Sequence, residues 1–311
     1  IEVSKLEVLN SAATPAFPLD DYQDVNEDVR LKNRILDLRR PEMNNRILKR
    51  SKIVSKIRNF LEERNFNEIE TPILTRATPE GARDYILPSR IHPGSFYALP
   101  QSPQLFKQML MMGGMDRYYQ VARCFRDEDL RADRQPEFTQ IDIEASFVEE
   151  RDIIELGSSL LKLLLKDFAN HNLDDIDELD YAHAINKYGS DKPDLRIHLE
   201  LLEISDEAKK EEFKVFSDPA KNDESRVVAL KVGGGNKLTR SQIDEYTNFV
   251  GKLGAKGLAY IKINDVSDIE NGLQSPILKF LSKDFITALF SKLNPVNDDL
   301  IFFGAGPSEI V

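Results

Sequence analysis

The sequence predicts an α+β fold, in which an antiparallel sheet flanked by helices is followed by a second, smaller α+β domain. Two observations support this prediction. Residues 117–126 and 136–148 alternate like two β-strands joined by a charged loop, and apolar residues recur at helical spacing in 41–65 and 149–171. From about residue 197 the composition changes and a new series of strands and helices begins.

Composition limits the classes of protein to consider. The 311 residues carry a net charge of −11 and are 41% hydrophobic, which suits two domains, or one large domain with an insertion, with a proper core. The one cysteine, Cys124, excludes an internal disulfide, and the four histidines are too scattered to favour a metal cluster or a Ser-His-Asp triad. No apolar run approaches the roughly 20 residues of a membrane helix, and no signal peptide opens the chain. We therefore expect a cytoplasmic protein with no membrane partner.

Charge is unevenly distributed along the chain. An acidic protein is a poor general binder of polyanions, but the stretch from Arg30 to Arg64 holds twelve Lys or Arg and four Asp or Glu. This local excess of positive charge fits either a surface that faces phosphates or an ordinary solvated helix surface.

The two predicted strands present contrasting faces. In the second strand an apolar set alternates with a set that contains one aromatic ring and three polar groups; the sets are Thr139, Ile141, Ile143, Ala145 and Phe138, Gln140, Asp142, Glu144. The polar face suits a nucleotide, because a ring can stack on a base and Arg126 can clamp a phosphate. The alternative is a solvated hairpin whose charges pair across strands.

The N-terminal third contains further signals. Residues 1–9 alternate like a strand without a partner, and residues 21–40 are polar and basic, as in a hinge. Pro41 opens a helix at its first position, where its missing N–H costs nothing. Ser102 and Pro103 have the pattern of an N-cap and first helical residue, which would make the positive helix start, with Lys107, a seat for a carboxylate or simply part of a surface helix.

Several of these stretches resemble a known family. Residues 125–138, Phe-Arg-Asp-Glu-Asp-Leu-Arg-Ala-Asp-Arg-Gln-Pro-Glu-Phe, resemble motif 2 of class II aminoacyl-tRNA synthetases, and in particular the bacterial type of aspartyl-tRNA synthetase. Residues 101–107 are similar to the aspartate-binding segment of that family, 41–72 to its motif 1, and 254–262 to the GAD domain inserted in its bacterial members. The third motif, a glycine-rich stretch ending in an arginine, is not found.

The resemblance implies a domain organisation. Residues 1–20 correspond to a remnant of the anticodon-binding OB domain, 21–40 to a hinge, 41–196 to the N-terminal part of a class II catalytic domain, and 197–311 to a GAD-like insertion. On this interpretation the chain lacks the motif 3 part and is incomplete for catalysis. Motif 1 implies a homodimer.

The implied activity is that of an aspartate–tRNA ligase, which forms aspartyl-adenylate from L-aspartate and ATP and transfers the acyl group to tRNA(Asp), or also to tRNA(Asn) in a non-discriminating enzyme. Arg126 is the implied catalytic residue. The implied ATP-binding residues are Arg126, Asp127, Glu128, Gln135 and Phe138. The implied aspartate-binding residues are Glu80, Ser102, Gln104, Leu105, Phe106, Lys107 and Arg126. The loop with Asp129, Arg131 and Arg134 is expected to approach the tRNA acceptor end. Mg²⁺ would accompany ATP, with its ligands in the missing C-terminal part and none in this chain.

Three alternatives remain open. A synthetase for asparagine or lysine is disfavoured by Gln135, where those enzymes usually have His, and by the GAD-like stretch. A truncated, non-catalytic module that binds tRNA or nucleotide is favoured by the missing third motif. A component of a tRNA-dependent amidotransferase would share only the GAD-like part, and the match to motif 2 argues against it.

Overall fold

The computed structural model describes residues 3–20, 23–78, 80–129 and 134–311. The chain divides into two compact units, residues 1–176 and 177–311. The boundary lies earlier than the expected one at 196, because helix α6 (Tyr181–Tyr188) packs on the second unit. Arg226 of that unit donates from Nη2 to the carbonyl of Asn186 at 3.1 Å. The functional identity of each part stays a prediction.

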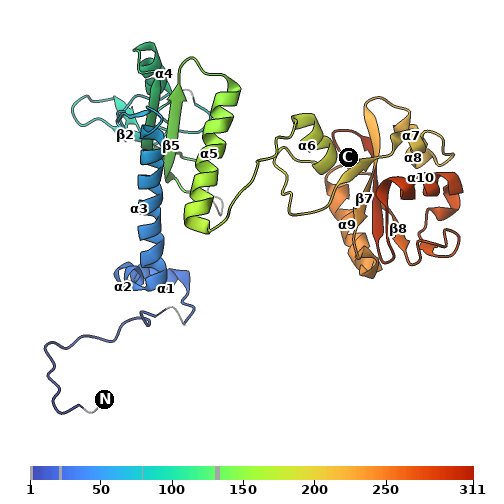
Figure 1. The fold of residues 1–311 in the computed structure, drawn as a ribbon, viewed down its shortest axis with the longest axis horizontal. Coiled ribbons are helices and arrows are strands. Elements are labelled where there is room, and N and C mark those ends of the chain that lie inside the picture. The colour runs from blue at the N-terminus through green and yellow to red at the C-terminus, as the bar shows by residue number, and fades with distance from the viewer. Residues whose placement is uncertain (1–2, 21–22, 79, 130–133) are drawn as a thin grey trace. The chain divides into compact units, whose positions relative to one another are not determined.

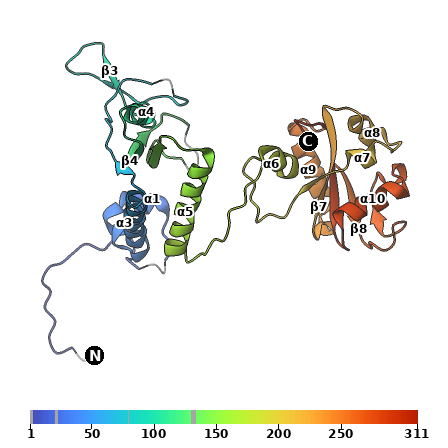
Figure 2. The same ribbon diagram turned by 45° about the horizontal axis from the view of Figure 1, so that its top comes forward.

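The first unit combines helices with a three-stranded sheet. Its elements are α1 (Glu27–Lys32), α2 (Arg34–Arg39), α3 (Pro41–Glu62), β1 (Asn67–Glu68), β2 (Ile86–Pro88), β3 (Phe96–Ala98), α4 (Gln104–Met112), β4 (Arg117–Phe125), β5 (Glu137–Ala145) and α5 (Glu150–Ala169). The sheet order is β1-β4-β5, with β1 parallel to β4 and β5 antiparallel to it. Strands β2 and β3 form a separate antiparallel pair. Figure 1 and, turned, Figure 2 show α3 and α5 running beside the main sheet.

The core of this unit lies between the two long helices and one face of the sheet. Pro41 is at the first position of α3, as predicted. The buried side chains Phe60 and Leu61 of α3 pack with Tyr119 of β4, and Ile141 and Ile143 of β5 join them. The predicted apolar face of the second strand is therefore confirmed as the face that packs inward.

The expected hinge is folded in its described part. Residues 23–40 contain α1 and α2, because Asp37 accepts hydrogen bonds from Arg30 at 2.8 Å and from Arg34 at 2.6 Å and is fully buried. Burial alone would raise the pKa of Asp37, but the hydrogen bonds and charges of the two arginines outweigh it and hold the pKa below its usual range. The expected strand at 1–9 is not formed in residues 3–9, which are exposed.

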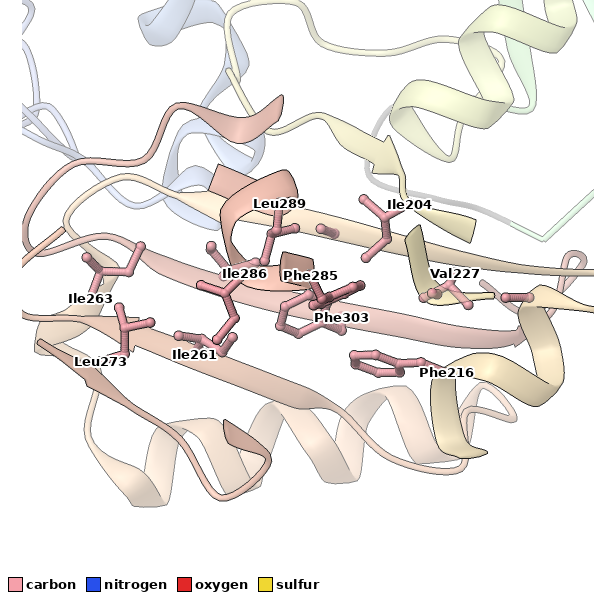
Figure 3. Packing of buried hydrophobic residues seen from close by; sticks show 14 residues of the cluster. Ile204, Phe216, Val227, Ile261, Ile263, Leu273, Phe285, Ile286, Leu289 and Phe303 are labelled. Atoms are coloured by element: carbon pink, nitrogen blue, oxygen red, sulfur yellow. The ribbon is translucent and has the colours of Figure 1, made fainter. Parts of the chain in front are cut away.

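The second unit is built on a five-stranded antiparallel sheet of order β6-β7-β10-β8-β9. After α6 its elements are β6 (Leu201–Glu203), α7 (Ser205–Ala208), α8 (Lys214–Ala220), β7 (Ser225–Val232), α9 (Arg240–Lys252), β8 (Ala259–Ile263), β9 (Leu273–Gln274), α10 (Lys283–Leu293) and β10 (Leu300–Pro307). Figure 3 shows the core, where Phe285 and Leu289 of α10 lie against Ile261 and Phe303 of the sheet. Within the described ranges, no helix is long and apolar enough to cross a membrane.

The glycine run at the end of β7 has a packing role. A Cβ on Gly235 would lie 2.8 Å from the Cβ of Leu300, closer than side chains tolerate. The glycine run therefore allows a close approach to β10. It lacks the Gly-Lys-Ser/Thr ending of a phosphate-binding loop, so its glycines are explained by packing.

We expect Leu289→Ala to lower the free energy of unfolding of the second unit by about 2–5 kcal/mol, because it leaves a cavity in a fully buried site. Denaturant unfolding followed by circular dichroism measures the change. Leu253→Ala, at a side chain that is 63% exposed, is the matched control and should stay within about 0.5 kcal/mol of the wild type. Equal losses in both variants would contradict this account of the core.

Candidate active site

The candidate site lies on the face of β4 and β5 that is turned away from the core. Directly opposite residues of an antiparallel pair share a face. Cys124 lies opposite Phe138, Ala122 opposite Gln140, Gln120 opposite Asp142, and Tyr118 opposite Glu144. The polar row of β5 therefore continues on β4 only at Gln120 and the hydroxyl of Tyr118, because Ala122 and Cys124 are small, buried side chains.

Lys107 of α4 is the cation of this face. Its Nζ donates to Asp142 Oδ1 at 2.9 Å and lies 3.3 Å from Glu144 Oε2. The side chains of Lys107 and Asp142 are 11% and 2% exposed. Burial alone would lower the pKa of Lys107, but the bonds and charges of the two acids outweigh it and raise the pKa, so the ammonium is charged at neutral pH.

The start of α4 differs from the prediction. The helix begins at Gln104 with Pro103 as the N-cap, and no side chain caps it. The hydroxyl of Ser102 instead donates to Glu80 Oε2 at 3.0 Å. The expected N-cap was therefore wrong by one residue, because the carboxylate of Glu80 takes the hydrogen bond of the hydroxyl. Two of the residues expected near the substrate ammonium, Glu80 and Ser102, are brought together by this contact.

The remaining residues expected to bind aspartate belong to the first turn of α4. Gln104 and Phe106 are half-buried, and Leu105 is 45% exposed. Arg126, expected to contact both substrates, follows β4 directly. Its backbone N–H donates to the carbonyl of Pro136 at 2.9 Å, so the turn between the strands holds it.

The guanidinium of Arg126 lacks a full set of partners. Its central carbon lies 5.1 Å from the centroid of the Phe138 ring, and its Nε is buried without a hydrogen-bond partner among the described residues. A buried donor without a partner costs free energy, so this nitrogen is positioned for an acceptor supplied from outside. Because β4 ends at Phe125, Arg126 and Glu128 are not on a common extended strand.

A pocket of about 380 Å³ opens beside Arg126. It is lined by Gly81, Ala82, Arg83, Asp127, Glu128, Asp129 and Arg134. Glu128 pairs with Arg134 at 3.3 Å across this pocket. The expected ATP residues Asp127 and Glu128 thus lie together with Asp129 and Arg134 of the expected tRNA loop. Gln135 is exposed nearby, and Arg131 lies outside the described residues.

Sequence reasoning did not assign roles to three residues that the structure brings into the site. Asp142 and Glu144 hold Lys107, and Gln140 donates from Nε2 to Asp142 Oδ1 at 2.9 Å. Their alternation was visible in the sequence, but their partner comes from α4, about thirty residues away, so only the folded chain could reveal it. No group of three or more His, Cys, Asp and Glu that could hold a metal occurs in the part of the chain described here.

This arrangement is an α+β class II catalytic fold, with antiparallel strands flanked by helices. One sheet face carries the rings of Phe138 and Tyr118, and Lys107 of α4 pairs with two carboxylates of that face. A family model described as tRNA synthetases class II (D, K and N) matches residues 26–286. Because the match spans more than half of the chain, the chain belongs to this family of aminoacyl-tRNA ligases, which use ATP.

Solved structures give a partial likeness. The chain is similar to a provisionally assigned aspartyl-tRNA synthetase from Leishmania major Friedlin, with 29% identity, a TM-score of 0.46, and coverage of 52% of this chain and 31% of that one. It is also similar to asparaginyl-tRNA synthetase from Pyrococcus horikoshii, complexed with asparaginyl-adenylate, with 24% identity, a TM-score of 0.45, and coverage of 52% and 37%. The chain thus spans about a third of the length of either protein. Because both TM-scores lie below 0.5, the family rests on the sequence model.

We expect Asp142→Asn to lower the pKa of Lys107 more than Glu144→Gln does, because Asp142 is both closer to Nζ and more deeply buried. Titration of selectively carbon-13-labelled lysine by NMR measures each shift. Equal shifts, or a larger one for Glu144→Gln, would show that Asp142 is not the principal counter-ion.

Proposed function

We propose that the protein is an aspartate–tRNA ligase of the bacterial type, which activates L-aspartate with ATP and transfers it to the 3′ end of tRNA(Asp). The observation that carries the proposal is the buried Lys107 ammonium, on the same sheet face as Phe138 and with Arg126 at the end of the neighbouring strand. One cation suits the substrate side chain, and the other suits the reacting phosphate and carboxylate.

In the first step an oxygen of the aspartate α-carboxylate attacks the α-phosphorus of ATP, and pyrophosphate leaves. Such a step depends on positioning and on stabilising charge. Arg126 bridges the α-phosphate and the α-carboxylate, and its unpartnered Nε accounts for one of the donors required. The base stacks on Phe138, so the guanidinium that covers this ring in the free protein swings toward the phosphate.

Selection of the amino acid falls to α4 and the segment before it. An ammonium group has three donors, of which Asp142 and Glu144 engage two of Lys107, and the third meets the side-chain carboxylate of aspartate. Glu80, Ser102 and Gln104 receive the substrate ammonium. A neutral side chain would offer this third N–H only an uncharged acceptor, and charge-assisted hydrogen bonds are the stronger ones, which is the basis for preferring aspartate.

Asparagine is the second candidate substrate, and one observation favours it. With both acids ionised, the group formed by Lys107, Asp142 and Glu144 has a net charge of −1. This charge opposes a further carboxylate and tolerates a neutral amide.

The other parts of the proposal concern partners. The loop with Asp129, Arg131 and Arg134 approaches the acceptor end of the tRNA, residues 41–72 contribute to a homodimer, and the second unit is a GAD-like domain. The enzyme acts in the cytoplasm. Mg²⁺ enters with ATP and offsets the negative charge of its phosphates.

The first test is ATP–pyrophosphate exchange on the full-length protein with aspartate, asparagine and lysine in turn. We expect exchange with aspartate only, because only its side chain offers the third N–H of Lys107 a charged acceptor. Exchange with asparagine alone would replace the proposed substrate by the second candidate. Absence of exchange with all three would refute the proposed function.

We also expect Arg126→Gln to reduce exchange by about 100- to 1,000-fold, because it removes a charged donor used on the reacting groups. Arg123→Gln is the matched control, since Arg123 is exposed and pairs with Glu137 on the opposite face of the strands. It should change the rate by about twofold at most. Near-normal exchange by a folded Arg126→Gln protein would remove Arg126 from the mechanism.

A further inference from the structure

Gln101 makes a buried set of hydrogen bonds that the proposed chemistry does not use. Its side chain is 2% exposed. Oε1 accepts from the backbone N–H of Ala82 at 2.9 Å, and Nε2 donates to the carbonyl of Ala82 at 2.7 Å and to Asp84 Oδ1. Both donors of the amide are thus engaged, and the side chain pairs with Ala82 as a neighbouring strand would.

The segment that Gln101 holds, residues 80–84, has no helix or strand of its own. One end carries Glu80, which accepts from Ser102. The other end is bonded to the nucleotide side, because the N–H of Asp127 donates to the carbonyl of Arg83 at 3.0 Å and Arg83 Nε donates to the carbonyl of Asp127 at 3.3 Å. Gln101 anchors the middle of the segment, between the two contacts.

Such an anchor bears on ligand binding. A segment without a ladder of backbone hydrogen bonds is ordered only by its contacts, and ordering it on binding would cost conformational entropy. Gln101 removes that cost in advance, because it fixes the backbone at Ala82, two residues from Glu80. The benefit falls on the ligand that Glu80 contacts, because the nucleotide side is held by the separate bonds between Arg83 and Asp127, which do not involve Gln101.

We propose that Gln101 is a positioning residue that sets the affinity for the amino acid by holding residues 80–84 in place. This inference rests on the proposed function for the identity of the ligand. Gln101 makes no contact with the substrate in this proposal. The affinity for the amino acid depends on Gln101, whereas the rate of adenylate formation does not.

The test is Gln101→Glu in the full-length protein. The glutamate keeps the size and the acceptor of glutamine, but it loses both donors and places a second carboxylate beside Asp84. In pyrophosphate exchange we expect the KM for the amino acid to rise by about tenfold or more, the effect of losing two buried hydrogen bonds. The KM for ATP and kcat should change by about twofold at most, which is a split that general damage to the fold would not give. Gln108→Glu, at an exposed position of α4, the helix that follows Gln101, is the matched control and should leave every constant unchanged.

Hydrogen exchange at the Ala82 amide gives a readout that does not depend on catalysis. We expect protection in the wild type and in Gln108→Glu. We expect fast exchange in Gln101→Glu, because repulsion of the new carboxylate by Asp84 and by the carbonyl of Ala82 moves the side chain away from the Ala82 N–H. Fast exchange of the Ala82 amide in the wild type would show that Gln101 does not hold this backbone. If Gln101→Glu speeds this exchange but leaves the KM for the amino acid unchanged, Gln101 has no role in amino-acid binding. If the wild type activates none of the three amino acids, the proposed function fails. The hydrogen bonds of Gln101 to Ala82 would still be supported if the Ala82 amide is protected in the wild type and exchanges fast in Gln101→Glu.

Discussion

The pairing register of β4 and β5 is the constraint on which the first unit depends. It turns Tyr119, Ile141 and Ile143 toward α3 and α5, and it turns Phe138 and Asp142 to the other side. Because side chains alternate along a strand, a slip of one residue would move the apolar set out of the core and the polar set into it. The hydrophobic core and the candidate site therefore select the same register, and the burial of one face fixes the geometry of the other.

The buried ion pair of Lys107 with Asp142 depends on that register. An isolated charge in this position would be costly to desolvate, and two carboxylates at fixed positions make the charge tolerable. A pair of this kind is weak evidence of stability, because apolar residues of similar volume often serve as well. The ion pair lies on the same sheet face as the aromatic ring of Phe138, and Arg126, whose Nε has no partner among the described residues, follows at the end of β4. A role of the pair in binding a ligand explains this placement better than a role in stability.

Much of the fold could be predicted from the sequence, and the reasons for the failures are local. Strands β4 and β5 were visible as periodicity, and the start of α3 was visible at Pro41. The short elements β6 and β9 were missed because two or three residues carry no period. Ser102 was misplaced because its hydroxyl has a tertiary partner, Glu80, that no local rule can foresee. For the same reason the counter-ions of Lys107 and the anchoring role of Gln101 required the folded chain.

Cys124 lies on the site face of β4, opposite Phe138, and is fully buried. Burial, with a contribution from the charge of Asp142, raises the pKa of its thiol to about 11, so the reactive thiolate is scarce at neutral pH. Since it is the one cysteine of the sequence, the folded chain offers almost no background to thiol-directed reagents. A cysteine introduced on the surface could be labelled selectively with a spectroscopic probe, and slow modification of Cys124 itself would report how often β4 becomes exposed.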